Sequence, residues 1–185
     1  MRILAVSGSL REGSFNTNLL RAALEAAPDG VELELWDGIG ELPFYDEDLE
    51  HNVPEPVRRL REDWAAADAI LFATPEYNGS VPGGLKNAID WGSRPRLEAV
   101  LRNKPVAVVG ASTGQFGALW AQQDLKRILG IAGARVVGTE IPVSRAHERF
   151  DAEGRLLDGE IFEQLRLHLT TLASEAVAVP ERAAA

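Results

Sequence analysis

The stretch GSLREGSFNTNLL, residues 8–20, follows a short apolar run and leads into a helical spacing of apolar residues. A helix that begins here presents free backbone N–H groups and the positive end of its dipole to the loop. Arg11 adds a planar guanidinium with paired donors, which suits a phosphate. The loop contains Ser7, Ser9, Arg11, Ser14, Asn16 and Thr17. We predict a phosphate-binding loop, with a simple helix cap at Ser14 or Asn16 as the alternative.

A second stretch, TPEYNGSVPGGLKNAIDW at residues 74–91, has the composition of a rigid ligand-binding loop. Pro75 and Pro82 restrict its backbone, and its glycines allow close approach of the chain to a ligand. Tyr77 and Asn78 offer an aromatic face and an amide that both donates and accepts hydrogen bonds. These features suit a flat heteroaromatic ring. The alternative is a stiff loop that leads into a helix with Pro82 near its start.

A third stretch, ASTGQFG at residues 111–117, adds Ser112, Thr113 and two glycines that would close over the same ring. Together the stretches describe a mononucleotide, with phosphate on the first loop and ring between the other two. A P-loop is excluded because GSLREGSF lacks its lysine, and a dinucleotide fingerprint because the only glycines there are Gly8 and Gly13. Asp37 is therefore interpreted as a turn residue.

The elements that position these loops alternate between strand and helix. Buried strands are expected at 2–7, 69–74 and 104–112, a half-exposed strand at 31–36, and a strand with an extended continuation at 134–143. Helices are expected at 16–27, 55–68, 84–92, 116–133 and 158–177. Residues 37–53 are acidic and irregular.

Unbroken apolar strands that alternate with helices predict a parallel sheet covered on both faces. We therefore expect an α/β fold, a three-layer α/β/α sandwich of flavodoxin-like type, with a five-stranded parallel sheet of order 2-1-3-4-5. Residues 1–180 are expected to form one domain and residues 181–185 a frayed tail. In such sheets ligands bind beyond the carboxyl ends of the strands, where the loops 8–16, 75–83 and 111–117 converge.

The composition excludes several classes of protein. The 185 residues carry a net charge of -9, which argues against general nucleic-acid binding. No apolar run is long enough to span a membrane, and the N-terminus is too short and polar for a signal peptide. The chain has no cysteine, which excludes thiolate chemistry and fits a cytoplasmic location. The three histidines are scattered, so no metal site is predicted.

The motifs GSLREGSFN and PEYNGSVPGGLKNAIDW together resemble those of the NAD(P)H-dependent FMN reductase family, and more narrowly its quinone, chromate and azo-dye reductase branch. The resemblance covers the whole chain and implies a flavodoxin-like fold with tightly, noncovalently bound FMN. It implies phosphate ligands at Ser9, Arg11, Ser14, Asn16 and Thr17. It also implies that Pro75, Glu76, Tyr77 and Asn78 line the isoalloxazine, with Ser112 and Gly114 facing the ring from the other side. The segment GASTGQFGALWAQQDLK follows the family only loosely.

The function implied is transfer of electrons from NADPH or NADH through FMN to a small acceptor: a quinone, a free flavin, an azo compound or a metal oxyanion. The cofactor performs the redox step, so no side chain is nominated as a catalytic acid, base or nucleophile. The resemblance also implies a homodimer or homotetramer with the flavin near a subunit interface. The alternatives are a flavodoxin-type electron carrier and a binding module without flavin. The carrier is disfavoured because the phosphate loop lacks the T-x-T-G-x-T form and has Arg11 instead.

Overall fold

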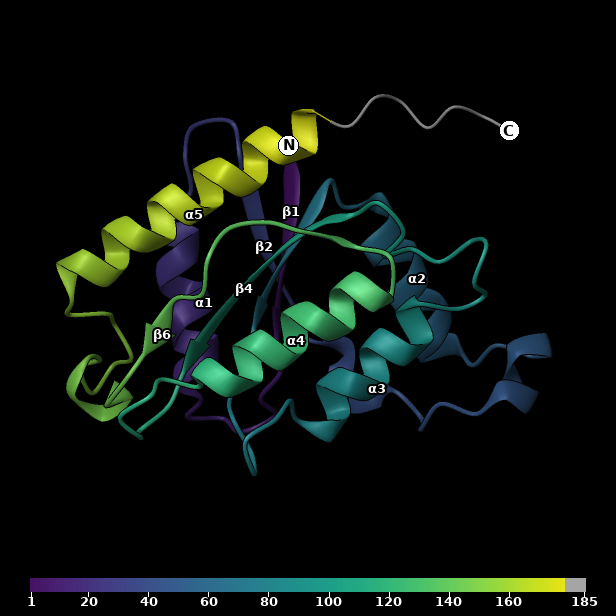
Figure 1. Cartoon of the computed structure of the whole chain (residues 1–185), viewed down its shortest axis with the longest axis horizontal. Helices are drawn as coiled ribbons and strands as arrows, with labels where there is room; N and C mark the ends of the chain where they lie inside the picture. Colours follow the sequence, from purple (N-terminus) through teal and green to yellow (C-terminus); the bar gives the residue numbers. More distant parts are fainter. Residues whose placement is uncertain (179–185) are drawn as a thin grey trace.

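The computed structural model describes residues 1–178, within which parallel strands alternate with helices (Figure 1). The strands are β1 (Arg2–Ser7), β2 (Glu32–Trp36), β3 (Ala69–Ala73), β4 (Pro105–Ala111), β5 (Arg135–Val136) and β6 (Pro142–Val143). The helices are α1 (Phe15–Glu25), α2 (Glu55–Ala66), α3 (Gly83–Gly92), α4 (Leu119–Ile131) and α5 (Gly159–Val177). Short 3-10 helices lie at η1 (Gly38–Glu41), η2 (Glu47–His51) and η3 (Ala146–Glu148). The predicted tail, 181–185, lies outside the described residues.

The sheet has the order β2-β1-β3-β4-β5, and the paired strands are parallel, as the sequence predicts. In the register of this sheet Val6 lies beside Phe72, and Phe72 lies beside Val108. The chain therefore leaves β1, β3 and β4 at the same edge. The three loops that carry the predicted site meet there.

Two hydrophobic cores lie on opposite faces of the sheet, because neighbouring residues of a strand point to opposite sides. Ile3 and Ala5 of β1 pack with α1 and α5, whereas Leu4 and Val6 pack with α2, α3 and α4. Figure 1 shows this division, with α1 and α5 on one face and the other three helices on the opposite face. The predicted flavodoxin-like α/β/α sandwich is confirmed.

The last strand differs from the prediction because it is broken into β5 and β6, which both pair with β4. Between them Gly138 adopts a left-handed φ of 73° beneath the ring of His168, where an added Cβ would lie 2.3 Å from the Cε1 atom. The fully buried Gln122 accepts a hydrogen bond from the Ile141 N–H at 3.0 Å. The side chains of Gln122 on α4 and His168 on α5 therefore lie where a single continuous strand would pair with β4.

The helix α4 also begins later than predicted, at Leu119 instead of residue 116. Gly117 and Ala118 both have left-handed backbones, with φ of 58° and 60°. This conformation interrupts helical geometry, so 116–118 belong to the preceding loop.

Among residues 1–178, no helix is both long and apolar enough to cross a membrane.

His168 on α5 is buried and is predicted to make stability depend on pH. Burial is the main cause that lowers its pKa to about 4, and Lys126 adds to the effect while Glu140 opposes it. Lys126 and Glu140 form an ion pair at 3.2 Å. The His168 Nε2 atom has no hydrogen-bond partner among the described residues.

Because the folded pKa lies below the unfolded value, the neutral ring stabilises the fold above pH ~6.5, and this contribution is lost as pH falls towards ~4. We expect His168 to account for a loss of about 2–3 kcal/mol in the free energy of unfolding between pH 7.5 and 4.5. The variant His168→Gln should show a shallower decline in urea titrations at the two pH values. An equal decline in both proteins would contradict this assignment.

Candidate functional site

A cavity of about 160 Å³ lies where the chain leaves β1, β3 and β4. All three predicted loops contribute to it, although they are far apart in the sequence. It is lined by Ser9, Arg11, Ser14, Phe15, Asn16, Pro75, Glu76, Tyr77, Ala111, Ser112 and Thr113. Of the predicted site residues, Thr17, Asn78 and Gly114 do not line it.

The N-terminus of α1 opens onto this cavity. Ser14 is the N-cap, and its Oγ accepts a hydrogen bond from the Thr17 N–H at 3.3 Å. The Thr17 hydroxyl lies 2.9 Å from that of Ser7, behind the cavity wall. The first turn of α1 carries no acidic residue. The helix dipole and its free N–H groups are therefore available to an anion.

Arg11 supplies a positive charge at the mouth of the cavity. Its guanidinium carbon lies 5.6 Å from the centre of the Phe15 ring, which in turn lies 5.7 Å from the Phe150 ring. Among residues 1–178, Arg11 forms no ion pair with a carboxylate. A guanidinium stacked on an aromatic face and unpaired in this way can take a phosphate.

Asn16 is almost completely buried and joins two of the loops. Its Nδ2 donates to the Ala111 carbonyl oxygen and its Oδ1 accepts from the Ala111 N–H, both at 2.9 Å. Both polar ends of the side chain are thus used inside the protein. A contact from Asn16 to a phosphate would come from its backbone N–H at the start of α1.

The loop after β3 is held by a tight turn. The backbones of Tyr77 and Ser80 exchange two hydrogen bonds at 3.1 Å. Asn78 and Gly79 between them have φ of 53° and 76°, as a two-residue turn of primed type requires. Asn78 therefore sits at the tip of the turn, while the Tyr77 side chain remains 55% exposed.

The loop after β4 lies across the cavity from this turn. Ser112 lines the cavity, and its Oγ accepts a hydrogen bond from the Gly114 N–H at 3.1 Å. Farther along, the half-exposed rings of Phe116 and Trp120 pack against each other with their centres 4.7 Å apart. Neither ring lines the cavity itself.

Phe15 and Ala111 line the cavity but were not predicted, whereas Thr113, which the third stretch offered beside Ser112, does line it. Phe15 is the first residue of α1, a position where an apolar residue is usually assigned to the core. Arg11, four positions earlier, could have indicated that Phe15 belongs to the site, because a cation and an aromatic ring at that spacing can stack. Ala111 is a small apolar residue at the end of β4, so its residue type gives no signal of a site.

The donors fit the phosphate end of a mononucleotide: serine hydroxyls, a helix N-terminus and an unpaired guanidinium. The enclosed volume of about 160 Å³ is smaller than the ~300 Å³ of a small ligand cleft, so it suits the phosphate and its chain but not a whole nucleotide. A ring attached to that phosphate would lie at the open end, between the Tyr77 turn and the Ser112 loop. The fold and site thus define a flavodoxin-like protein with a mononucleotide site.

Comparison with known proteins identifies the family. The family model of NADPH-dependent FMN reductases matches residues 1–148, and the chain belongs to this family. It is 45% identical over 174 residues to NAD(P)H-dependent FMN reductase PA1204 of Pseudomonas aeruginosa, covering 93% of each chain. It is 36% identical to a 2-hydroxy-1,4-benzoquinone reductase of Burkholderia sp, covering 94% of this chain and 95% of the relative.

A solved structure agrees with this result. The flavoenzyme FerB of Paracoccus denitrificans, an NAD(P)H:(acceptor) oxidoreductase, superimposes with a TM-score of 0.82 at 34% identity, covering 94% of this chain and 98% of FerB. The protein is thus an oxidoreductase with FMN as cofactor and NAD(P)H as reductant.

Proposed function

We propose that this protein passes electrons from NAD(P)H to a small quinone, with the FMN phosphate at the N-terminus of α1 and the flavin ring at the open end of the cavity. When bound, FMN supplies the redox chemistry by accepting a hydride and releasing electrons to the acceptor. The chain's own residues bind and orient it. The proposed cofactor contacts are the predicted residues Ser9, Arg11, Ser14, Pro75, Tyr77 and Ser112, which line the cavity, with Asn16 acting through its backbone.

One observation carries this placement: the unpaired guanidinium of Arg11 and the acid-free N-terminus of α1 line the same small cavity as Tyr77 and Ser112. In a chain with a net charge of -9, an anion needs such a local group of donors. The arrangement supplies a phosphate end and a ring end in one cavity.

A quinone is the acceptor that the surroundings favour among those considered. Tyr77, which lines the cavity, is 55% exposed, and Phe116 and Trp120, which follow the Ser112 loop in the chain, are 47% and 48% exposed, so aromatic faces remain uncovered near the site. Planar aromatic compounds stack on such faces, whereas an oxyanion would require cations there. Curated relatives named quinone reductases support the same choice.

Anaerobic mixing of the FMN-loaded protein with NADPH tests the function. NADPH should bleach the visible absorbance of the bound flavin, and a benzoquinone added afterwards should restore this absorbance. A flavodoxin-type carrier would leave the flavin oxidised, and this result would refute the proposal. Steady-state rates with benzoquinone, free flavin, an azo dye and chromate then rank the acceptors; a quinone ranked below chromate would refute the choice of acceptor.

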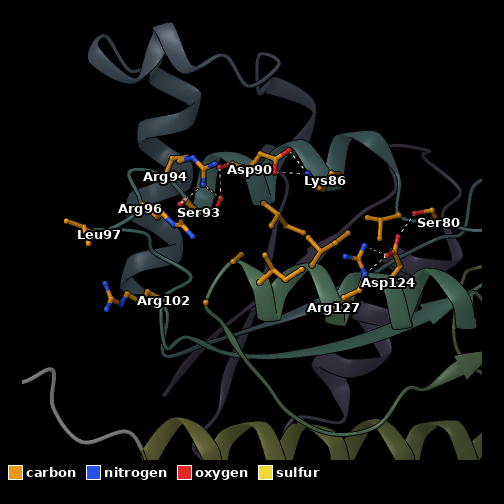
Figure 2. A pocket seen from close by; sticks show the side chains of 16 residues that line it. Ser80, Lys86, Asp90, Ser93, Arg94, Arg96, Leu97, Arg102, Asp124 and Arg127 are labelled. Carbon is orange, nitrogen blue, oxygen red and sulfur yellow. Dashed lines mark hydrogen bonds and ion pairs between the residues drawn. The ribbon is translucent and has the colours of Figure 1, made fainter.

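We further propose that the protein forms a homodimer, because a surface groove with exposed apolar residues begins at the loop after β3. The groove, of about 850 Å³, lies between α3 and α4 instead of at the carboxyl edge of the sheet. Figure 2 shows Ser80 and Asp124 at one end of it and Leu97 and Arg102 at the other. Apolar side chains, among them Val81, Ile89, Ile128 and Ile131, form its floor.

A second copy suits this groove because it would cover exposed apolar side chains. Leu97 and Ile131 are 84% and 75% exposed. The lining carries two carboxylates, Asp90 and Asp124, among several basic residues, so a twofold axis could bring a carboxylate of one copy against an arginine of the other. Sedimentation equilibrium should give twice the chain mass, or four times it for a dimer of dimers. A monomer at all concentrations would contradict the proposal.

The organisation and location of the chain remain predictions from composition and pattern. We propose a single domain over residues 1–180 and a cytoplasmic location, the latter supported by the lack of cysteine.

A further inference from the structure

The N-terminus of α4 lacks a cap from its own segment. The residue at the N-cap is Ala118, which has no side-chain acceptor, and the first turn contains no acidic residue. A helix start leaves N–H groups without partners, and an acceptor from elsewhere stabilises them. Here the carboxylate of Glu76 supplies it: Oε2 accepts a hydrogen bond from the Ala121 N–H at 3.2 Å. Glu76 belongs to the loop after β3, 45 positions earlier.

A second contact joins the same loop to the same helix. The Ser80 hydroxyl donates to the Asp124 carboxylate at 2.5 Å, as Figure 2 shows at one end of the groove. This hydrogen bond is the main cause that lowers the pKa of Asp124, with Arg127 contributing next. The turn at Tyr77–Ser80 between the two contacts is itself held by backbone hydrogen bonds. The loop after β3 is thus tied to α4 at Glu76 and at Ser80.

The start of α4 in turn fixes the loop after β4, because that loop runs directly into it. Gln122, fully buried in the first turns of α4, donates from Nε2 to the Gly117 carbonyl oxygen at 3.1 Å. Gly117 lies so close to β6 that an added Cβ would be 2.5 Å from the carbonyl carbon of Pro142. The position of α4 therefore decides where residues 111–118 lie.

We propose that Glu76 is a positioning residue for FMN: by capping α4 from the opposite loop, it sets the separation of the two loops between which the flavin ring lies. Glu76 lines the cavity, and its carboxylate accepts the hydrogen bond from the helix start at Ala121. This inference rests on the placement of FMN proposed above. It gives the glutamate a role through α4, in contrast to the direct contact that its position in the motif implies.

Two substitutions separate the cap from the charge. Glu76→Gln keeps an oxygen that can accept from the Ala121 N–H, whereas Glu76→Ala removes it. Loss of the cap leaves an N–H group at the helix start without a partner, and a neutral amide oxygen can still serve as that partner. We expect Glu76→Ala to weaken FMN binding about tenfold and Glu76→Gln by less than about threefold. Glu62→Ala, which removes an exposed carboxylate on α2, is the matched control and should bind FMN as the wild type does.

FMN titration of the apoprotein, followed by flavin fluorescence, gives these affinities, and urea unfolding of each apoprotein shows whether the fold is retained. Rescue by Glu76→Gln supports positioning. Equal weakening in both variants shows that the charge matters instead of the cap and overturns the proposal, as does wild-type affinity in Glu76→Ala. If neither Arg11→Ala nor the Glu76 variants change FMN affinity, the proposed placement of FMN is wrong. If Arg11→Ala weakens binding and the Glu76 variants do not, the placement is supported and the role of Glu76 is refuted.

Discussion

Asn16→Ala is expected to lower the free energy of unfolding by about 2–4 kcal/mol, because it leaves two buried backbone groups without partners. The Asn16 side chain satisfies both the N–H and the carbonyl of Ala111, at 2.9 Å each. These bonds also hold the start of α1 against the end of β4. We therefore expect FMN affinity to fall along with stability.

Two further variants make this result specific. Asn16→Asp retains the acceptor for the Ala111 N–H but directs an oxygen at the Ala111 carbonyl, so it should destabilise the protein at least as much as Asn16→Ala. Asn18→Ala removes an amide oxygen that accepts from the exposed Arg21, and it should cost less than about 0.5 kcal/mol. Urea unfolding of the apoproteins provides the comparison. A loss below about 1 kcal/mol in Asn16→Ala would show that the bridge is dispensable.

Gly117→Ala is expected to cost about 2–5 kcal/mol, from backbone strain and overpacking together. Gly117 has a φ of 58°, and an added Cβ would lie 2.5 Å from the Pro142 carbonyl carbon and 2.7 Å from the Val143 nitrogen. These are backbone atoms of β6 that cannot move aside as a side chain would. The loop 111–118 must therefore separate from β6, and binding of the flavin ring should weaken as well.

Gly114→Ala is the matched control in the same loop. Its backbone is not left-handed, and the nearest atom to an added Cβ is the Ser112 Oγ at 3.5 Å, an ordinary contact. We expect it to change the free energy of unfolding by less than about 1 kcal/mol. Similar losses in the two glycine variants would contradict the assignment of strain to Gly117.

The strand order could be predicted from the sequence because it depends on the alternation of apolar runs with helices and on the handedness of crossovers. The convergence of the three loops followed from that topology alone. Asn78 and Gly79 were predicted to lie in a loop, and their left-handed turn agrees with the turn chemistry of Asn-Gly. These features are local or topological, so they are readable from residue types.

The rest depends on contacts between distant segments, which a single sequence does not encode in its spacing. Asn16 was predicted as a phosphate ligand, yet its side chain is bound to Ala111, 95 positions away. The break between β5 and β6 depends on Gln122 and His168 from two helices. The cap that Glu76 provides for α4 was likewise invisible, because the helix start at Ala118 has no cap residue of its own.

The central claim is that Arg11 and the N-terminus of α1 hold the phosphate of FMN. Comparing FMN with riboflavin, which lacks the phosphate, in titrations of the wild type and Arg11→Ala tests it most directly. The wild type should bind FMN far more tightly than riboflavin. Arg11→Ala should weaken FMN about 10- to 100-fold, the effect of losing charged hydrogen bonds, and leave riboflavin unchanged. Equal weakening of both ligands, or of neither, would contradict the account.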